Sequence, residues 1–126
     1  MNMQRICLTG GNYKKALERF QMSIELNPEY ISAYHQIGNI YTEMKSYAQA
    51  YYEFELAAKT DPADSVTYVD WGIALCKDSQ HKEAIEKFAK AIELNSESSE
   101  GYCQWGNNLS FLGKYEEAIE GNKNLS

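Results

Sequence analysis

The chain has 126 residues, of which 44% are hydrophobic and 13% aromatic, which predicts a single folded domain and excludes a disordered or low-complexity segment. Its net charge of −6 disfavours nucleic acid and anionic membranes as ligands, because binding to phosphates relies on clustered lysine and arginine. No apolar stretch reaches the roughly 18 residues needed to cross a bilayer, and the first residues lack the apolar core of a secretory signal. We therefore expect a cytoplasmic protein that does not insert into membranes.

The chain repeats itself with a fixed period. Gly38, Gly72 and Gly106 are spaced 34 residues apart, and each lies in a copy of the same apolar pattern. In chain order, the copies divide the single domain into a partial unit, two complete units and a second partial unit, over residues 1–30, 31–64, 65–98 and 99–126. Such a period predicts units that stack, because none can bury its apolar face alone.

Each unit is predicted to form two helices. In the first half, apolar residues recur at i, i+3, i+4 and i+7, as at Tyr34, Ile37 and Tyr41, which predicts a helix with one buried stripe. The second half has a similar stripe, in which small residues alternate with a large one, as at Ala50 and Phe54. Large side chains can therefore enter the space that small ones leave across a helix pair.

Helix boundaries follow from short polar residues and proline. The second helices are expected to end at Asn27–Pro28, Asp61–Pro62 and Asn95–Ser96, with Asp64 or Ser65 as the N-cap of the next helix.

Three short links are expected to turn the chain within a unit: Gly10–Gly11, Lys45–Ser46 and Gly113–Lys114. Links this short leave the two helices antiparallel, as a hairpin. The last helix is expected to end near Glu120, because Asn122 stands where the other units have a phenylalanine.

Residues that could carry chemistry are few. Cys7, Cys76 and Cys103 are an odd number without close spacing, which argues against a disulfide framework and a zinc site. His35 has no cysteine at i,i+4, and His81 is in phase with core tyrosines of other units. No phosphate-binding loop or nucleophile motif is present, so we expect no enzyme activity, no cofactor and no metal.

The pattern resembles the tetratricopeptide repeat family strongly over residues 13–120 and weakly over residues 1–12, with Ser96, Ser23 and Gln4 as departures. The resemblance implies an all-α, right-handed α-solenoid of antiparallel helix hairpins, whose first helices line a concave groove. One unit alone meets the signature positions of the family at Tyr34, Gly38, Tyr41, Ala50, Phe54, Ala57 and Pro62.

The same resemblance implies a set of peptide-binding residues in that groove. They are His35, Gln36, Asn39, Glu43, Val69, Asp70, Ile73, Lys77, Cys103, Gln104, Asn107 and Phe111.

Within this set, Val69 and Ile73 are expected to form an exposed hydrophobic contact, and Lys77 and Glu43 to adjust specificity. Asn39 and Asn107 stand where some family members hold a peptide backbone or a terminal carboxylate, since an amide offers both a donor and an acceptor. Simple solvation of a surface asparagine is the alternative.

Some family members grip the acidic tails of heat-shock chaperones with basic residues, and this clamp is disfavoured here. The matching positions hold His35, Glu100 and Gln104, and Glu100 would repel a carboxylate.

The predicted function is a protein–protein interaction scaffold that binds a peptide or helix of a partner protein in its concave groove. The alternative is a structural self-association module, a homo-oligomer formed through the terminal repeats, which lack capping elements.

Overall fold

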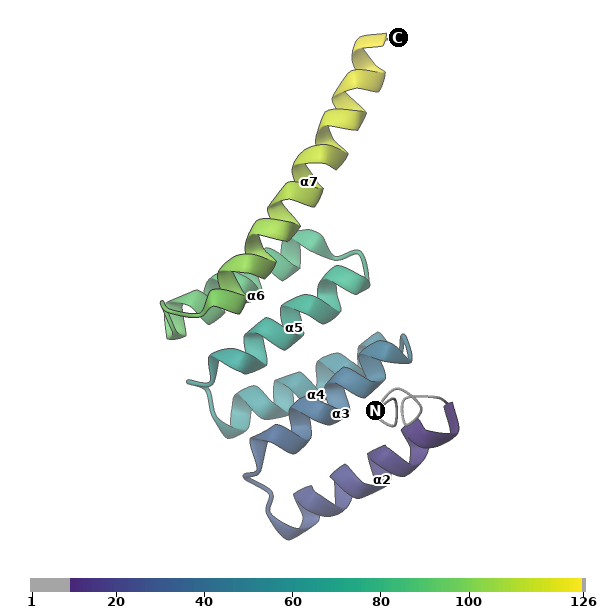
Figure 1. Cartoon of the computed structure of the whole chain (residues 1–126), viewed down its shortest axis with the longest axis vertical. Coiled ribbons are helices and arrows are strands. Elements are labelled where there is room, and N and C mark those ends of the chain that lie inside the picture. The colour runs from purple at the N-terminus through teal and green to yellow at the C-terminus, as the bar shows by residue number, and fades with distance from the viewer. Residues whose placement is uncertain (1–9, 126) are drawn as a thin grey trace, which may run out of the picture.

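The computed structural model describes the backbone of residues 10–125 and the side chains of residues 12–113, and every element within that range is a helix. The first helices of successive units begin 34 residues apart, which confirms the predicted period (Figure 1). The helices are α2 (Gly10–Leu26), α3 (Ile31–Glu43), α4 (Tyr47–Thr60), α5 (Ser65–Lys77), α6 (His81–Leu94) and α7 (Ser99–Leu125).

The predicted helix ends are confirmed. Helices α2, α4 and α6 end at Leu26, Thr60 and Leu94, each one residue before a predicted break. Asp64 is the N-cap of α5, and its Oδ1 accepts a hydrogen bond from the backbone N–H of Val66 at 3.3 Å. A side-chain acceptor here satisfies one of the N–H groups that a helix start leaves unpaired.

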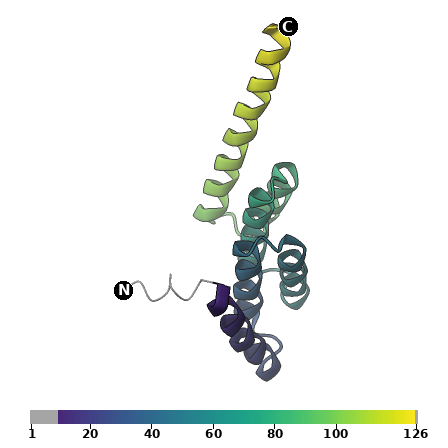
Figure 2. The same cartoon turned by 90° about the vertical axis from the view of Figure 1, so that its right-hand side faces the viewer.

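Helices α3 with α4, and α5 with α6, form two hairpins that stack on each other (Figures 1 and 2). Each hairpin closes through one residue in the left-handed region, Lys45 or Ser79, both with φ of 64°. The two turns are again 34 residues apart, so the repeat extends to the backbone conformation of the turn.

The core consists of phenylalanines of the second helices packed beneath glycines of the first. Phe54 and Phe88 are fully buried. A Cβ placed on Gly38 would lie 2.7 Å from the ring of Phe54, and one on Gly72 would lie 2.4 Å from the ring of Phe88. Glycine is therefore required where the two helices of a hairpin approach most closely. Trp71 packs against the buried cluster around Phe54 and also against the one around Phe88, and so connects the two hairpins.

This packing predicts opposite effects of alanine at equivalent glycines. Gly72→Ala should lower the free energy of unfolding by about 1–2 kcal/mol, since the strain of overpacking exceeds the gain in helix propensity. Gly106→Ala should raise it by up to about 1 kcal/mol, because nothing lies within 4 Å of its added Cβ. Urea denaturation of both variants at low protein concentration measures the difference, and equal effects would contradict this account of the glycines.

The fourth unit departs from the prediction. Residues 99–125 form one continuous helix, so the turn expected at Gly113–Lys114 and the helix end expected near Glu120 are both wrong. No described glycine has positive φ, so Gly113 does not adopt the conformation that closes the other hairpins. Asn122 also lacks the ring that would fill the space beside Gly106, which removes the contact that secures a hairpin.

At the other end, α2 begins at Gly10, so the predicted Gly10–Gly11 link belongs to a helix. The helix expected ahead of it lies outside the described residues.

Candidate peptide-binding surface

The predicted binding residues lie on three helices that follow one another in the stack, α3, α5 and α7. The structure leaves most of them accessible to a ligand. Gln36, Glu43, Lys77, Cys103, Asn107 and Phe111 are exposed, Asn39, Asp70, Ile73 and Gln104 are partly exposed, and His35 and Val69 are buried.

The expected exposure of Val69 is wrong, because its side chain is only 2% exposed. The equivalent residue of α3, His35, is also buried, whereas the equivalent residue of α7, Cys103, is exposed. This register position faces the next helix of the stack, as the bond from His35 to Thr67 of α5 shows. Cys103 is exposed because no described helix follows α7.

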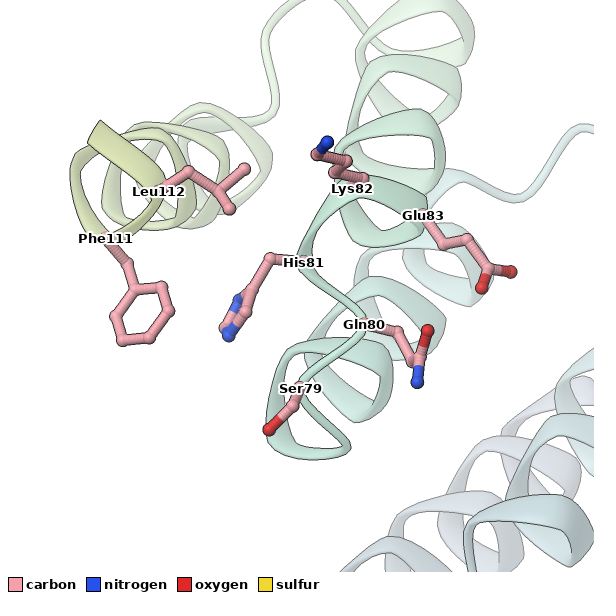
Figure 3. Close-up of a pocket in the computed structure, with 7 residues that line it drawn as sticks. All are labelled: Ser79, Gln80, His81, Lys82, Glu83, Phe111 and Leu112. Atoms are coloured by element: carbon pink, nitrogen blue, oxygen red, sulfur yellow. The ribbon is translucent and has the colours of Figure 1, made fainter. Parts of the chain in front are cut away.

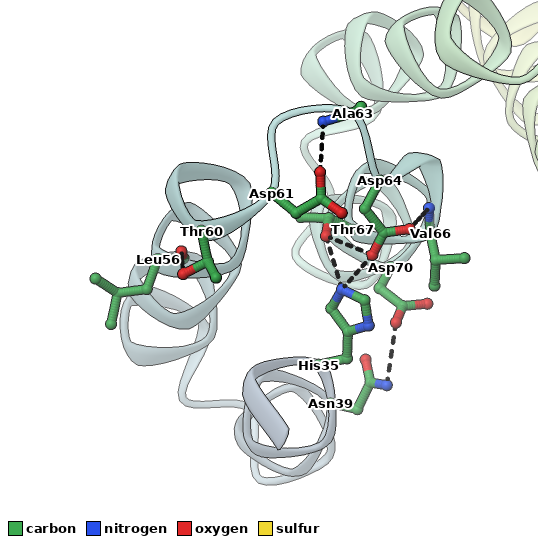
Figure 4. A network of polar contacts seen from close by, with 10 residues as sticks. All are labelled: His35, Asn39, Leu56, Thr60, Asp61, Ala63, Asp64, Val66, Thr67 and Asp70. Atoms are coloured by element: carbon green, nitrogen blue, oxygen red, sulfur yellow. Dashed lines mark hydrogen bonds and ion pairs between the residues drawn. The ribbon is translucent and has the colours of Figure 1, made fainter. Parts of the chain in front are cut away.

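His35, the other buried residue of the predicted set, is not exposed as expected and makes its polar contacts within the stack. Its Nε2 lies 2.7 Å from Oγ1 of Thr67 and 3.3 Å from Oδ2 of Asp64, so it joins α3 to the start of α5 (Figure 4). Burial lowers the pKa of His35, and the nearby Asp64 carboxylate offsets only part of that effect. The ring is therefore neutral at neutral pH, and we assign the proton to Nε2, which donates to Thr67.

Asp70 lies near the middle of the surface, beside Asn39. The Nδ2 of Asn39 donates to Oδ2 of Asp70 at 3.3 Å (Figure 4). The pKa of Asp70 is raised to about 6, chiefly by burial; the bond from Asn39 lowers the pKa, and the charges of Glu100 and Asp64 raise it. A cationic group placed here would stabilise the ionised carboxylate.

The only predicted binding residue with a positive charge already has a partner. Nζ of Lys77 lies 3.3 Å from Oε2 of Glu43, a residue at the same register position of α3. Both side chains are about half exposed, so the pair contributes about 1 kcal/mol or less. With Lys77 neutralised by Glu43, the remaining charge on this surface comes from Asp70 and Glu100.

On α7, the sequence prediction overlooked a buried amide. Asn108 is buried, its Nδ2 donates to the backbone oxygen of His81 at 2.7 Å, and its Oδ1 lies 2.6 Å from Nδ1 of the same histidine. The signal is present in the sequence, because the two complete units have apolar residues, Ile40 and Ala74, at this position. Asn108 and His81 therefore pair α6 with α7.

A cavity of about 510 Å³ lies where the start of α6 faces α7. His81 and Phe111 line it from the two helices, with their ring centroids 4.2 Å apart, and Leu112 adds an apolar wall (Figure 3). Of the predicted binding residues, only Phe111 contributes to this cavity. The other accessible residues of the predicted set lie outside this cavity, on the exposed face of α3, α5 and α7.

Within the described part of the chain, no group of three or more histidine, cysteine or acidic side chains is placed to hold a metal ion. Of the helices described there, none is both long and apolar enough to span a membrane.

The arrangement defines a class of protein, a solenoid of stacked helix hairpins. Two family models match the chain, one described as TPR repeat over residues 5–45 and the other as tetratricopeptide repeat over residues 31–64. The chain therefore contains tetratricopeptide repeats, which the models match over residues 5–64.

Solved structures share the fold. A MamA RS-1 double mutant is 26% identical with a TM-score of 0.67, and the alignment covers 87% of this chain but only 62% of the MamA chain. The first TPR domain of human RPAP3 is 18% identical with a TM-score of 0.75, over 90% of this chain and 89% of the other. The first TPR of Spaghetti (RPAP3), bound to the HSP90 peptide SRMEEVD, is 17% identical with a TM-score of 0.73, over 86% and 89% of the two chains. A comparison with curated protein sequences finds no match.

Proposed function

We propose that this protein is a non-catalytic scaffold that binds a peptide or a short helix of another protein along the exposed face of α3, α5 and α7. The observation that carries the proposal is a series of amide side chains on this face: Gln36, Asn39, Gln104 and Asn107 are all at least partly exposed. Amides can pair with both the N–H and the C=O of a peptide backbone. Ile73 adds a partly exposed apolar contact.

The charge of the face favours a ligand with a basic side chain. Asp70 and Glu100 would attract lysine or arginine, and they would repel a peptide such as SRMEEVD, the RPAP3 ligand, which has three acidic side chains. The fold shared with RPAP3 supports the kind of ligand, a peptide, while the residues of this chain favour a different charge.

Peptides selected from a random displayed library against the whole chain would test the proposal. We expect the selected peptides to be enriched in basic residues. We also expect the double variant Gln36→Ala with Asn107→Ala to weaken their binding by about tenfold or more in calorimetric titrations, through lost backbone hydrogen bonds. Both residues are exposed, so the variant should fold normally.

Tyr52→Ala is the matched control, because Tyr52 is exposed on α4 and lies outside the proposed face. Undiminished binding by the double variant, or equal weakening by the control, would reject this face as the binding site.

A further inference from the structure

One face of α7 lacks the cover that equivalent faces have. Leu109 is 50% exposed, whereas Leu75, its equivalent in α5, is 3% exposed. A Cβ on Gly106 would meet nothing within 4 Å, whereas one on Gly72 would meet the ring of Phe88. Tyr102 is also exposed on α7. This uncovered face is the one that, in α3 and α5, packs against the second helix of the same hairpin.

The segment that should cover this face is present in the chain but lies elsewhere. Residues 114–120 have the sequence pattern of a second helix, with Tyr115 and Ala118 in phase with Tyr47 and Ala50. In the structure they continue α7, whose C-terminal half projects beyond the stacked hairpins in both views (Figures 1 and 2). Within one straight helix, the second half cannot fold onto the first.

Gly113 lies at the boundary between the uncovered face and the projecting segment. It occupies the register position of Lys45 and Ser79, the left-handed residues that close the other two hairpins. Glycine adopts that conformation more easily than lysine or serine does, yet here it continues the helix. The fourth unit is therefore an opened hairpin, with its two halves separated.

We propose that α7 pairs antiparallel with α7 of a second copy of this chain, so that residues 116–125 of each copy cover residues 103–112 of the other. The arrangement restores the contact that the first half of α7 lacks, and it has the two-fold symmetry usual in homodimers. It goes beyond the peptide-binding face of the proposed function, because it uses the side of α7 that packs within a hairpin.

The complete hairpins give the register of this pairing. Gly38 meets Phe54 and Gly72 meets Phe88, so Gly106 of one copy lies opposite Asn122 of the other. Asparagine fills less of the space than phenylalanine would, which makes the dimer reversible. The cavity beside His81 and Phe111 lies near the crossing point, where the helix of the second copy would cover it (Figure 3).

Sedimentation equilibrium over a dilution series tests the pairing. We expect a mass of twice 14.4 kDa that falls to that of the monomer on dilution. Leu109→Glu should raise the dissociation constant by more than about tenfold, because the dimer would bury an unpaired charge. The control is Met22→Glu, at a side chain on α2 that is 55% exposed, and it should leave dimerisation unchanged. A monomer at every concentration, or a dimer unaffected by Leu109→Glu, would overturn the proposal.

A disulfide trap distinguishes pairing between copies from closure within one copy. In the proposed register, residue 122 of one copy lies opposite Gly106 of the other, and Gly106 lies on the uncovered face. Mild oxidation of the double variant Gly106→Cys with Asn122→Cys, in a chain that also carries Cys103→Ser, should therefore yield a covalent dimer, and either new cysteine alone should not. A disulfide within one chain would show that the hairpin closes on itself, and no disulfide would show that the register is wrong; either result overturns the proposal.

Discussion

Phe88→Ala should lower the free energy of unfolding by about 3–5 kcal/mol, the largest single-residue effect that we expect in this protein. The ring is fully buried and packs beside Leu75 and Ala84. It also fills the space beside Gly72, which has no side chain that could move in to replace the ring. Removal of the ring would therefore leave a cavity that the helices on either side cannot close.

Tyr52→Ala is the control for this prediction, because it removes an aromatic ring that is mostly exposed on α4. Its expected effect is about 0.5 kcal/mol or less. Urea denaturation followed by circular dichroism measures both variants. Similar losses at the two positions would show that Phe88 is not the residue that holds α5 against α6.

The core could be predicted from the sequence because the same apolar pattern occurs in several copies. A single Ala-x3-Phe pattern says little, but copies in phase with Gly38 and Gly72 indicate which faces must meet. The structure confirms both contacts. Helix ends were predictable for a similar reason, since Pro28 and Pro62 mark equivalent breaks.

The binding surface was predicted less well, because burial there depends on neighbouring helices. Periodicity within one helix identifies the stripe that faces its own hairpin, but not the residues that face the next unit. His35 and Val69 belong to this second group, and both are buried. The predicted turn at Gly113–Lys114 was wrong for a related reason: the link allows a hairpin, but the packing beside Gly106 that would secure one is missing.

At neutral pH, Asp70→Asn should raise the free energy of unfolding by about 1–3 kcal/mol; the lower figure allows for solvent screening of a partly exposed carboxylate. Burial raises the pKa of Asp70 from its usual 3.8 to about 6, so ionising it costs more in the folded chain than in the unfolded chain. An asparagine keeps an oxygen that can accept the bond from Asn39 and removes the charge. The increase in the free energy of unfolding tests whether the charge of Asp70 destabilises the free protein, as expected for a carboxylate that binds a cationic ligand.

The pH dependence of this gain distinguishes a charge effect from a packing effect. Between pH 3.8 and about 6 the folded chain binds more protons at Asp70 than the unfolded chain, so the contribution of Asp70 to stability is lost as pH rises through that range. The difference between Asp70→Asn and the unaltered protein should therefore be near zero below about pH 4 and reach its maximum at neutral pH. His35 acts in the opposite direction, because burial lowers its pKa and folding then weakens as pH falls below 6.5. Since the variant retains His35, its stability should show the loss below pH 6.5 more clearly than that of the unaltered protein. A difference in stability between the two proteins that stays constant across pH would assign the effect of Asp70 to packing alone.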